Sequence, residues 1–462
     1  MSGKVRVVTV GSSLAPLLAD AAARASHYAE AAAARSIAPS QAARDALGHL
    51  DGPLPEQPSA PADVLRLLDE AGSPAATVST AGRYFGFVNG GVLPAALAAK
   101  WLAATWNQNA ALRVMSPIAA KLEDIALAWL QDLLGLPAGC GGGFVTCATM
   151  ANFAGLCAAR HALLRRAGWD VEQRGLFGAP EIAVYVGEEV HVSILKALMM
   201  AGFGRERVTR IPADGQGRLR AEKIPALGDG SLLILQAGNV NTGAFDPFEE
   251  ACARAREAGA WVHVDAAFGM WAAASPARAH LTRGLMNADS WGADAHKWLN
   301  AGYDSGLVFV RDGEALRAAM SVTAPYLISG DAREPAHFTP ESSRWPRGVE
   351  VWAALRSLGR AGVIELVERC CRHAVRFSEG LRAAGYAVLN DVVLNQVMVS
   401  FGRPEKTRSV IAAVQQEGTC WCGGTEWQGH TAMRISVSDW ATTEDDVERS
   451  LAAILRMAKQ SS

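Results

Sequence analysis

The fold is decided by the stretch Trp261–Ala267, with the sequence WVHVDAA, together with Ala288–Asn300, with the sequence ADSWGADAHKWLN. The first is a short run of apolar and β-prone residues that ends on Asp265, which predicts a buried strand with a carboxylate at its carboxyl end. The second begins as a similar strand and continues to Lys297. Because α/β sheets bind ligands at the carboxyl ends of their strands, we expect this acid and this lysine at one site.

An aspartate opposite a lysine is compatible with two interpretations. The pair can be a buried ion pair that serves the structure alone. It also matches the two groups that pyridoxal 5'-phosphate (PLP) requires, which are an amine for its aldehyde and a carboxylate that keeps its ring nitrogen protonated. Ala266 and Ala267 follow the acid and are small enough for a flat ring to lie against the backbone.

Residues 263–267 (HVDAA) and 294–300 (DAHKWLN) resemble the cofactor motifs of the group II PLP-dependent amino-acid decarboxylases, which include the aromatic-amino-acid and glutamate decarboxylases. The resemblance implies the type I fold of PLP-dependent transferases, with a large three-layer α/β domain, a mostly parallel sheet and a small C-terminal α/β domain. It implies a carboxy-lyase in which Lys297 binds the cofactor and Asp265 contacts the ring nitrogen.

Composition agrees with a large globular enzyme. The chain has 462 residues, of which 50% are hydrophobic and 19% are charged, and its net charge is −2. This balance gives no electrostatic reason to expect binding to nucleic acid or to an anionic membrane. No secretory signal or spanning segment is recognisable, so the cytoplasm is expected. The eight cysteines lack the paired spacing of a zinc site, and no metal is expected.

The chain divides into three predicted parts. Residues 1–61 are an Ala-rich helical arm and a Pro-rich linker, residues 62–365 are the large domain, and residues 366–462 are the small domain. Strands predicted at 182–186, 208–211, 232–236 and 261–265 alternate with helices at 193–201 and 247–258, which indicates a parallel three-layer domain. In the resembling family the arm packs across a partner subunit, which implies a homodimer with active sites at the subunit interface.

The remaining cofactor contacts come from the resemblance. Gly141–Asn152 is predicted to be a glycine-rich turn that opens a helix, and such an N-terminus suits a phosphate. Ala148 and Thr149 occupy the family's phosphate-binding positions, and His296 is the second phosphate contact in relatives. His191 would stack on one face of the ring while Ala267 closes the other face. In the loop after the strand at 232–236, Asn239 and Val240 replace two threonines of the family.

Substrate contacts are predicted on the same basis. The segment Arg83–Gly90 resembles a family segment that lines the substrate pocket, which makes Tyr84 and Phe85 candidate substrate contacts. Arg344 is the candidate anchor for the substrate carboxylate, with Arg347 as the competing position. Relatives that release an amine protonate the product from a loop tyrosine, and residues 328–348 contain none. His337 is therefore the candidate general acid, and Tyr326 is the nearest tyrosine before this segment.

The prediction is an L-amino-acid decarboxylase that releases carbon dioxide and an amine, with an aromatic or bulky substrate favoured by the aromatic residues near Tyr84. Three alternatives remain. An aldehyde synthase of the same family would also consume oxygen and release ammonia. An aldolase or aminotransferase could use the same fold and the same residue pair, because fold does not fix the reaction. A PLP-binding regulator without turnover would carry a DNA-binding segment, and none is recognisable in the sequence.

Overall fold

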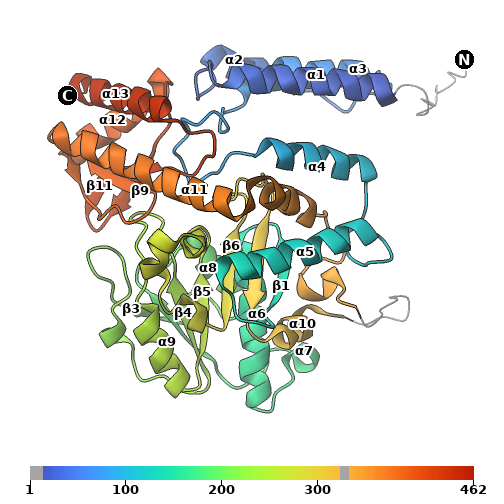
Figure 1. The fold of residues 1–462 in the computed structure, drawn as a ribbon, viewed down its shortest axis with the longest axis vertical. Helices are drawn as coiled ribbons and strands as arrows, with labels where there is room; N and C mark the ends of the chain where they lie inside the picture. The colour runs from blue at the N-terminus through green and yellow to red at the C-terminus, as the bar shows by residue number, and fades with distance from the viewer. Residues whose placement is uncertain (1–13, 323–331, 462) are drawn as a thin grey trace, which may run out of the picture.

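The apolar runs in the middle of the chain form a seven-stranded sheet in the computed structural model, which describes residues 14–322 and 332–461 (Figure 1). Its strand order is β1-β7-β6-β5-β4-β2-β3. The strands are β1 (Gly141–Val145), β2 (Ala183–Gly187), β3 (Val208–Ile211), β4 (Ser231–Gln236), β5 (Trp261–Asp265), β6 (Ser290–Asp294) and β7 (Gly306–Val310). Neighbours from β3 through β6 pair in parallel, whereas β7 runs antiparallel to both β6 and β1. The predicted mostly parallel sheet is confirmed.

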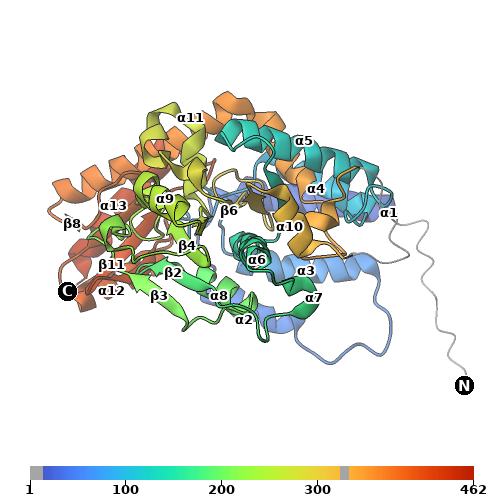
Figure 2. The ribbon, with the colours of Figure 1, turned by 90° about the horizontal axis from the view of Figure 1, so that it is seen from below.

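Helices cover both faces of this sheet, as the views in Figures 1 and 2 show. Apolar residues of one face share a buried cluster with α6 (Ala148–Arg166), α8 (Val192–Met200) and α10 (Gly313–Met320). Apolar residues of the other face share a second cluster with α5 (Pro117–Leu134), α9 (Phe248–Glu257) and α11 (Gly348–Ala383). The three-layer architecture is therefore confirmed, and the predicted helices at 193–201 and 247–258 correspond to α8 and α9.

The glycine run at residues 141–143 is a strand and not the predicted turn. It forms β1, which pairs with β7 in antiparallel register from Gly141 opposite Val310 to Val145 opposite Gly306. A Cβ on Gly142 would lie 2.8 Å from the Phe309 ring, and one on Gly143 would lie 2.8 Å from the Phe338 carbonyl oxygen. Close packing therefore requires glycine in this strand, although the residue is unfavourable in strands in general.

The C-terminal part forms a second, antiparallel sheet in the order β10-β11-β9-β8. Its strands are β8 (Ala387–Val388), β9 (Gln396–Ser400), β10 (Gly423–Trp427) and β11 (His430–Ser436), and its helices are α12 (Pro404–Glu417) and α13 (Glu444–Gln460). The small α/β unit expected there is confirmed. The long helix α11 crosses the predicted domain boundary at 365–366, with one non-helical residue at Gly359, so the domain limits stay a prediction.

The N-terminal arm contains α1 (Leu14–Ala32), α2 (Gln41–Ala46), η1 (Leu47–Leu50) and α3 (Pro61–Ala75), and it lies beside the C-terminal helices in Figure 1. The arm contacts the C-terminal part of the chain, where the N–H of Ile37 donates a hydrogen bond of 2.9 Å to the carbonyl oxygen of Gly418. The next helix is α4 (Pro94–Trp106). Short helical segments complete the description: α7 (Val171–Arg174), η2 (Ala221–Lys223), η3 (Gly269–Ala274), η4 (Pro276–Thr282), η5 (Leu285–Asn287) and η6 (Pro335–Phe338).

Two classes of feature do not occur among the described residues. No helix in residues 14–322 and 332–461 has the length and apolar character needed to cross a membrane. Nor do those residues contain a group of three or more His, Cys, Asp or Glu side chains arranged to hold a metal ion. All eight cysteines are free thiols, and seven of them are buried.

Candidate active site

The turn that follows β6 places Lys297 beside a buried carboxylate. Lys297 Nζ lies 3.1 Å from Asp294 Oδ2, and Asp294 is 2% exposed. The other oxygen, Asp294 Oδ1, accepts a hydrogen bond of 2.5 Å from the backbone N–H of Ala148 and lies 3.6 Å from His296 Nε2. Asp294 thus joins the lysine to the first residue of α6. The sequence analysis quoted this residue but assigned it no role.

Asp265 ends β5, the strand next to β6, and the register pairs it with Gly292. Its side chain is buried, and Oδ1 accepts a hydrogen bond of 3.3 Å from the N–H of Ala267. Asp265 and Lys297 both line a cavity of about 210 Å³ at the carboxyl ends of the parallel strands. The expected meeting of the acid and the lysine at one pocket is therefore confirmed, because neighbouring parallel strands end at the same edge of the sheet.

His191 closes the pocket from the N-terminus of α8. Its Nδ1 accepts a hydrogen bond of 3.2 Å from the N–H of Ser193 and lies 2.7 Å from the Ser193 hydroxyl. Burial lowers the pKa of His191, and the positive charges of Lys297 and Arg434 oppose protonation further, although Asp265 favours it. The ring is therefore neutral near pH 7, which suits a stacking role for an imidazole. Ala267 lines the same cavity.

The end of the cavity suited to an anion is formed by two helix N-termini. Ala148 and Thr149 begin α6, and Ser193 lies in the first turn of α8; all three line the cavity together with His296. Helix N-termini present free N–H groups and the positive end of the helix dipole, so they favour a phosphate. The structure thus brings Ala148, Thr149, His191, Asp265, Ala267, His296 and Lys297 to one cavity. This set fits a planar cofactor with a phosphate group.

Arg344 does not lie in this cavity, and its assignment as the substrate anchor was wrong. Its side chain has no exposed surface, and NH1 lies 2.8 Å from Glu123 Oε2. NH2 donates a hydrogen bond of 2.7 Å to the carbonyl oxygen of Phe144. A guanidinium that is fully buried and paired within the protein has no surface for a substrate. The competing Arg347 is paired with Asp304, with Nε 3.0 Å from Oδ1.

The two aromatic candidates also lie outside the cavity. Tyr84 stacks on Trp421, with ring centroids 5.1 Å apart, and is 8% exposed. Phe85 is 1% exposed and packs edge-on against Phe377 of α11. Neither residue therefore lines the pocket of its own chain, so the prediction from the sequence was wrong for this pocket. The backbone bridge between Tyr84 and Trp421 turns both rings into the protein. The neighbouring Phe87 is 61% exposed.

His337 belongs to η6, which packs against β1 and α10. It is not among the residues that line the cavity of its own chain, so its role as general acid stays a prediction. Tyr326 and the first part of the segment 328–348 lie outside the described residues.

Arg434 is the cation that the sequence analysis missed. It lies on β11 of the small domain, burial lowers its pKa, and its charge acts on His191. NH1 donates a hydrogen bond of 3.4 Å to Asn241 Oδ1. Within the described part of the chain, no carboxylate lies within the 4.0 Å that defines an ion pair with it. A half-buried arginine without an acid is expected to face an anionic ligand.

Comparison with known proteins identifies the architecture. Residues 53–401 match the model of the pyridoxal-dependent decarboxylase conserved domain, which is about three quarters of the chain. The chain belongs to the pyridoxal-dependent decarboxylase family. It is a PLP-dependent carboxy-lyase, and the resemblance noted from residues 263–267 and 294–300 is confirmed.

Individual relatives agree with this family and differ in their reactions. The chain is 28% identical to tryptophan decarboxylase 1 of Oryza sativa subsp. japonica over 72% of this chain and 70% of that protein. It is 27% identical to phenylacetaldehyde synthase of Petunia hybrida over 72% and 69% of the two proteins. The crystal structure of Oryza sativa TDC with PLP and tryptamine superposes with a TM-score of 0.90, at 22% identity and with 98% and 99% of the two chains covered.

Proposed function

We propose that this decarboxylase converts an L-amino acid to carbon dioxide and the corresponding amine. The observation that carries the proposal is the placement of Lys297 and Asp265 on adjacent strand ends at one cavity, with the neutral ring of His191 beside them. PLP, when bound, supplies an aldehyde for a covalent bond to an amine and a ring that accepts electrons from the substrate. The side chains of the protein must supply everything else that the reaction requires.

Three of these requirements concern the cofactor. Lys297 would hold the aldehyde of the bound cofactor through its amine, and the substrate amine would take its place. Asp265 keeps a proton on the ring nitrogen, since its buried carboxylate stabilises the positive charge there. Asp294 holds the turn of Lys297 against the N-terminus of α6 through its contacts with Lys297 Nζ and Ala148 N.

The substrate carboxylate requires a cation, and we assign this role to Arg434. Its guanidinium is half-buried, its charge acts on His191, and it lacks an acid among the residues that the structure describes. An arginine binds a carboxylate with a fixed planar geometry, so it can hold the bond between Cα and the carboxylate perpendicular to the cofactor ring. That orientation selects decarboxylation over the other reactions of the fold.

The proton that completes the amine decides between the two leading functions. His337 stays the candidate acid, because an imidazole can serve as a general acid. If no group delivers this proton, the carbanion meets oxygen and the products are an aldehyde, ammonia and peroxide. The similarity to phenylacetaldehyde synthase of Petunia hybrida makes the aldehyde synthase the second candidate.

An aromatic or bulky substrate and a homodimer are part of the same proposal. The substrate class is supported by the relatives named above and by Phe268 and Val240 in the cavity wall. The dimer is supported by exposed apolar side chains on α1, α3 and α4: Leu14, Leu18, Val64, Leu67, Leu68, Leu97, Trp101, Leu102 and Trp106. Apolar surface of this extent is usually covered in oligomers. We further expect a cytoplasmic enzyme, which cell fractionation would test.

The test is to incubate the purified holoenzyme with each of the twenty common L-amino acids and to measure carbon dioxide, amine, ammonia and peroxide. We expect carbon dioxide and amine in equal amounts, fastest with an aromatic substrate, and no peroxide. Equal amounts of carbon dioxide, ammonia and peroxide would instead establish the aldehyde synthase. Turnover without carbon dioxide would refute both.

A further inference from the structure

The turn that carries Lys297 ends on a buried asparagine in an unusual conformation. Asn300 has no exposed surface, and its φ of 54° lies in the left-handed region. Asparagine tolerates this region better than most residues, but a fully buried side chain there needs hydrogen-bond partners. The sequence motif contains this residue, yet none of the roles assigned above uses it.

The carboxamide of Asn300 has all of its partners within the protein. Oδ1 accepts hydrogen bonds from the N–H of Gly91 at 2.6 Å and from the N–H of Trp440 at 3.1 Å. Nδ2 donates to the carbonyl oxygen of Trp298 at 2.9 Å and to that of Ser438 at 3.0 Å. A carboxamide offers two donors and an oxygen with two lone pairs, so all of its hydrogen-bonding capacity is used.

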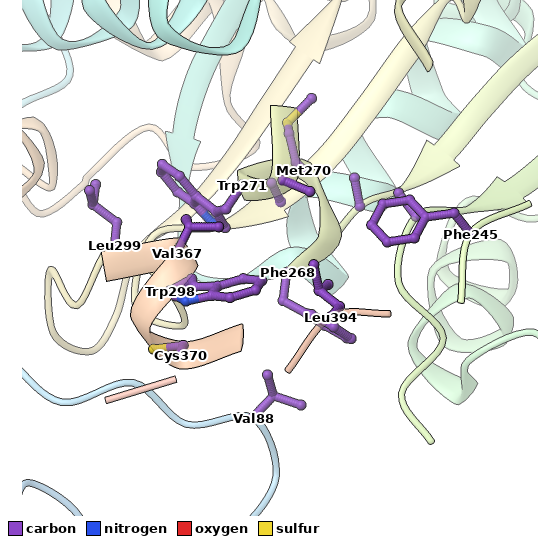
Figure 3. Packing of buried hydrophobic residues seen from close by; sticks show 14 of the residues in the cluster. Val88, Phe245, Phe268, Met270, Trp271, Trp298, Leu299, Val367, Cys370 and Leu394 are labelled. Atoms are coloured by element: carbon purple, nitrogen blue, oxygen red, sulfur yellow. The ribbon is translucent and has the colours of Figure 1, made fainter. Parts of the chain in front are cut away.

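These bonds join three parts of the chain that pack closely at two glycines. A Cβ on Gly90 would lie 1.8 Å from the carbonyl oxygen of Lys297, and one on Gly91 would lie 2.4 Å from Asp439 Oδ1. The turn is also packed from the other side, where Trp298 shares a buried cluster with Val88 and with Cys370 of α11 (Figure 3). Little room remains for the turn to shift.

The third segment that Asn300 contacts lies just after β11, the strand that carries Arg434. β11 ends at Ser436, and Asn300 bonds to Ser438 and Trp440 immediately beyond it. A single carboxamide therefore connects the turn of Lys297 in the large domain to the segment that follows Arg434 in the small domain. In the proposed function the substrate amine would take the place of Lys297 at the cofactor aldehyde while the substrate carboxylate binds Arg434, so the spacing of these two groups matters.

We propose that Asn300 is a positioning residue that sets the location of the Lys297 amine relative to the Arg434 guanidinium. This inference rests on the proposed function, in which the substrate amine would replace Lys297 while the substrate carboxylate binds Arg434. A displacement of about 1 Å between two groups that hold a substrate is enough to reduce turnover about 100-fold. The carboxamide should therefore matter for ligands that contact both groups and much less for ligands that contact one.

The test compares Asn300→Gly with Asn107→Gly. Glycine adopts a positive φ without strain, so the first variant removes the carboxamide and keeps the turn. Asn107 is the matched control, because it has a φ of 48° at the exposed C-terminal end of α4 and no side-chain role in the site. Hydrogen exchange of the Gly91 and Trp440 amides, measured with and without cofactor, reports the loss of the two bonds directly.

We expect both amides to exchange at least 10-fold faster in Asn300→Gly and at the wild-type rate in Asn107→Gly. For the amino-acid substrate, kcat/KM should fall about 100-fold. The reaction of the holoenzyme with hydroxylamine, an amine without a carboxylate that consumes the yellow absorbance, should change less than threefold. Equal losses with both ligands, or an unchanged kcat/KM, would overturn the positioning role.

A second variant covers the case in which Asn300→Gly fails to fold. Asn300→Asp keeps the oxygen that accepts from Gly91 and Trp440 and removes the amide donor to Ser438, so we expect protected amides with an intermediate loss of kcat/KM. Full activity in this variant would contradict the proposal. If the wild-type protein decarboxylates no amino acid, the proposed function fails, whereas the exchange and hydroxylamine results still report on Asn300.

Discussion

Arg344 is buried and Arg434 is half-buried, and their partners differ. Arg344 belongs to a closed cluster in which Glu123 pairs with Arg344 at 2.8 Å and with Arg333 at 2.9 Å. Among the described residues, Arg434 donates a hydrogen bond of 3.4 Å to the amide oxygen of Asn241 and pairs with no acid, and its charge acts on the ring of His191. The first guanidinium has its counter-charge in the protein, whereas the second requires one from outside. Burial alone does not distinguish a structural cation from a binding cation, and the placement of the acids does.

The same contrast applies to two buried histidines. His263 has both ring nitrogens occupied, with Nδ1 2.8 Å from Ser290 Oγ and Nε2 3.0 Å from Asn152 Oδ1. His191 uses Nδ1 for Ser193 and faces the cavity beside Lys297. Polar groups with all of their partners in the protein should affect stability when they are changed. Polar groups that face the cavity should affect catalysis.

The largest effect is expected at the cavity. We expect Lys297→Ala to abolish turnover, since no other amine lines the cavity in the described structure. Borohydride reduction of the holoenzyme followed by peptide mapping should find the phosphopyridoxyl group on Lys297. A label on Lys196 or Lys100 would contradict the assignment, and a normal melting temperature would show that the variant is folded.

A change in the buried cluster of Glu123, Arg333 and Arg344 should lower the free energy of unfolding. Glu123→Gln removes the acid that pairs with Arg344 and leaves a buried charge uncompensated, so we expect a loss of about 3–5 kcal/mol in the free energy of unfolding. The matched control is Asp132→Asn, which removes the exposed partner of Arg360 and should cost at most about 1 kcal/mol. Urea unfolding measures both. A cost for Glu123→Gln no larger than that of the control would remove the distinction between the clusters.

Arg434→Gln should lower catalysis without lowering the stability of the fold. We expect a fall in kcat/KM of about 10- to 100-fold, mainly through KM, because the variant loses a charged hydrogen bond to the substrate carboxylate. The free energy of unfolding should stay nearly unchanged, since Arg434 is half-buried and pairs with no acid among the described residues. Arg344→Met provides the comparison and should lower stability instead. If Arg434→Gln unfolds as readily as Arg344→Met, Arg434 is a structural cation.

The smallest effect is a pH dependence from His263. Burial lowers its pKa to about 3, so the unfolded chain binds a proton below about pH 6.5 and the folded chain does not. Stability should therefore fall as the pH drops, by about 2 kcal/mol from this residue between pH 6.5 and pH 5. His263→Gln should flatten this part of the profile in urea unfolding at several pH values. An equally steep profile in the variant would assign the dependence to other groups.

The sequence by itself determined the sheet and the reactive pair. Apolar runs of four to six residues between helical patterns located β2 through β5 within one residue at either end. Strand ends in a parallel sheet share one edge, so the positions of Asp265 and Lys297 along the chain were sufficient to predict that they meet. These features depend on local periodicity and on a general rule of topology, and both are readable without coordinates.

Only the tertiary structure decided which polar and aromatic side chains face the cavity. Arg344 and Arg434 are alike in sequence terms, and their difference depends on where Glu123 and Asn241 lie after folding. Tyr84 and Phe85 turn into the protein because their segment pairs with Trp421, more than 300 residues away in the chain. The same holds for Asn300, whose carboxamide bonds within its own turn and to two distant segments, at Gly91 and at Ser438 and Trp440. Charge compensation and side-chain direction are properties of packed neighbours, and no local pattern in the sequence encodes them.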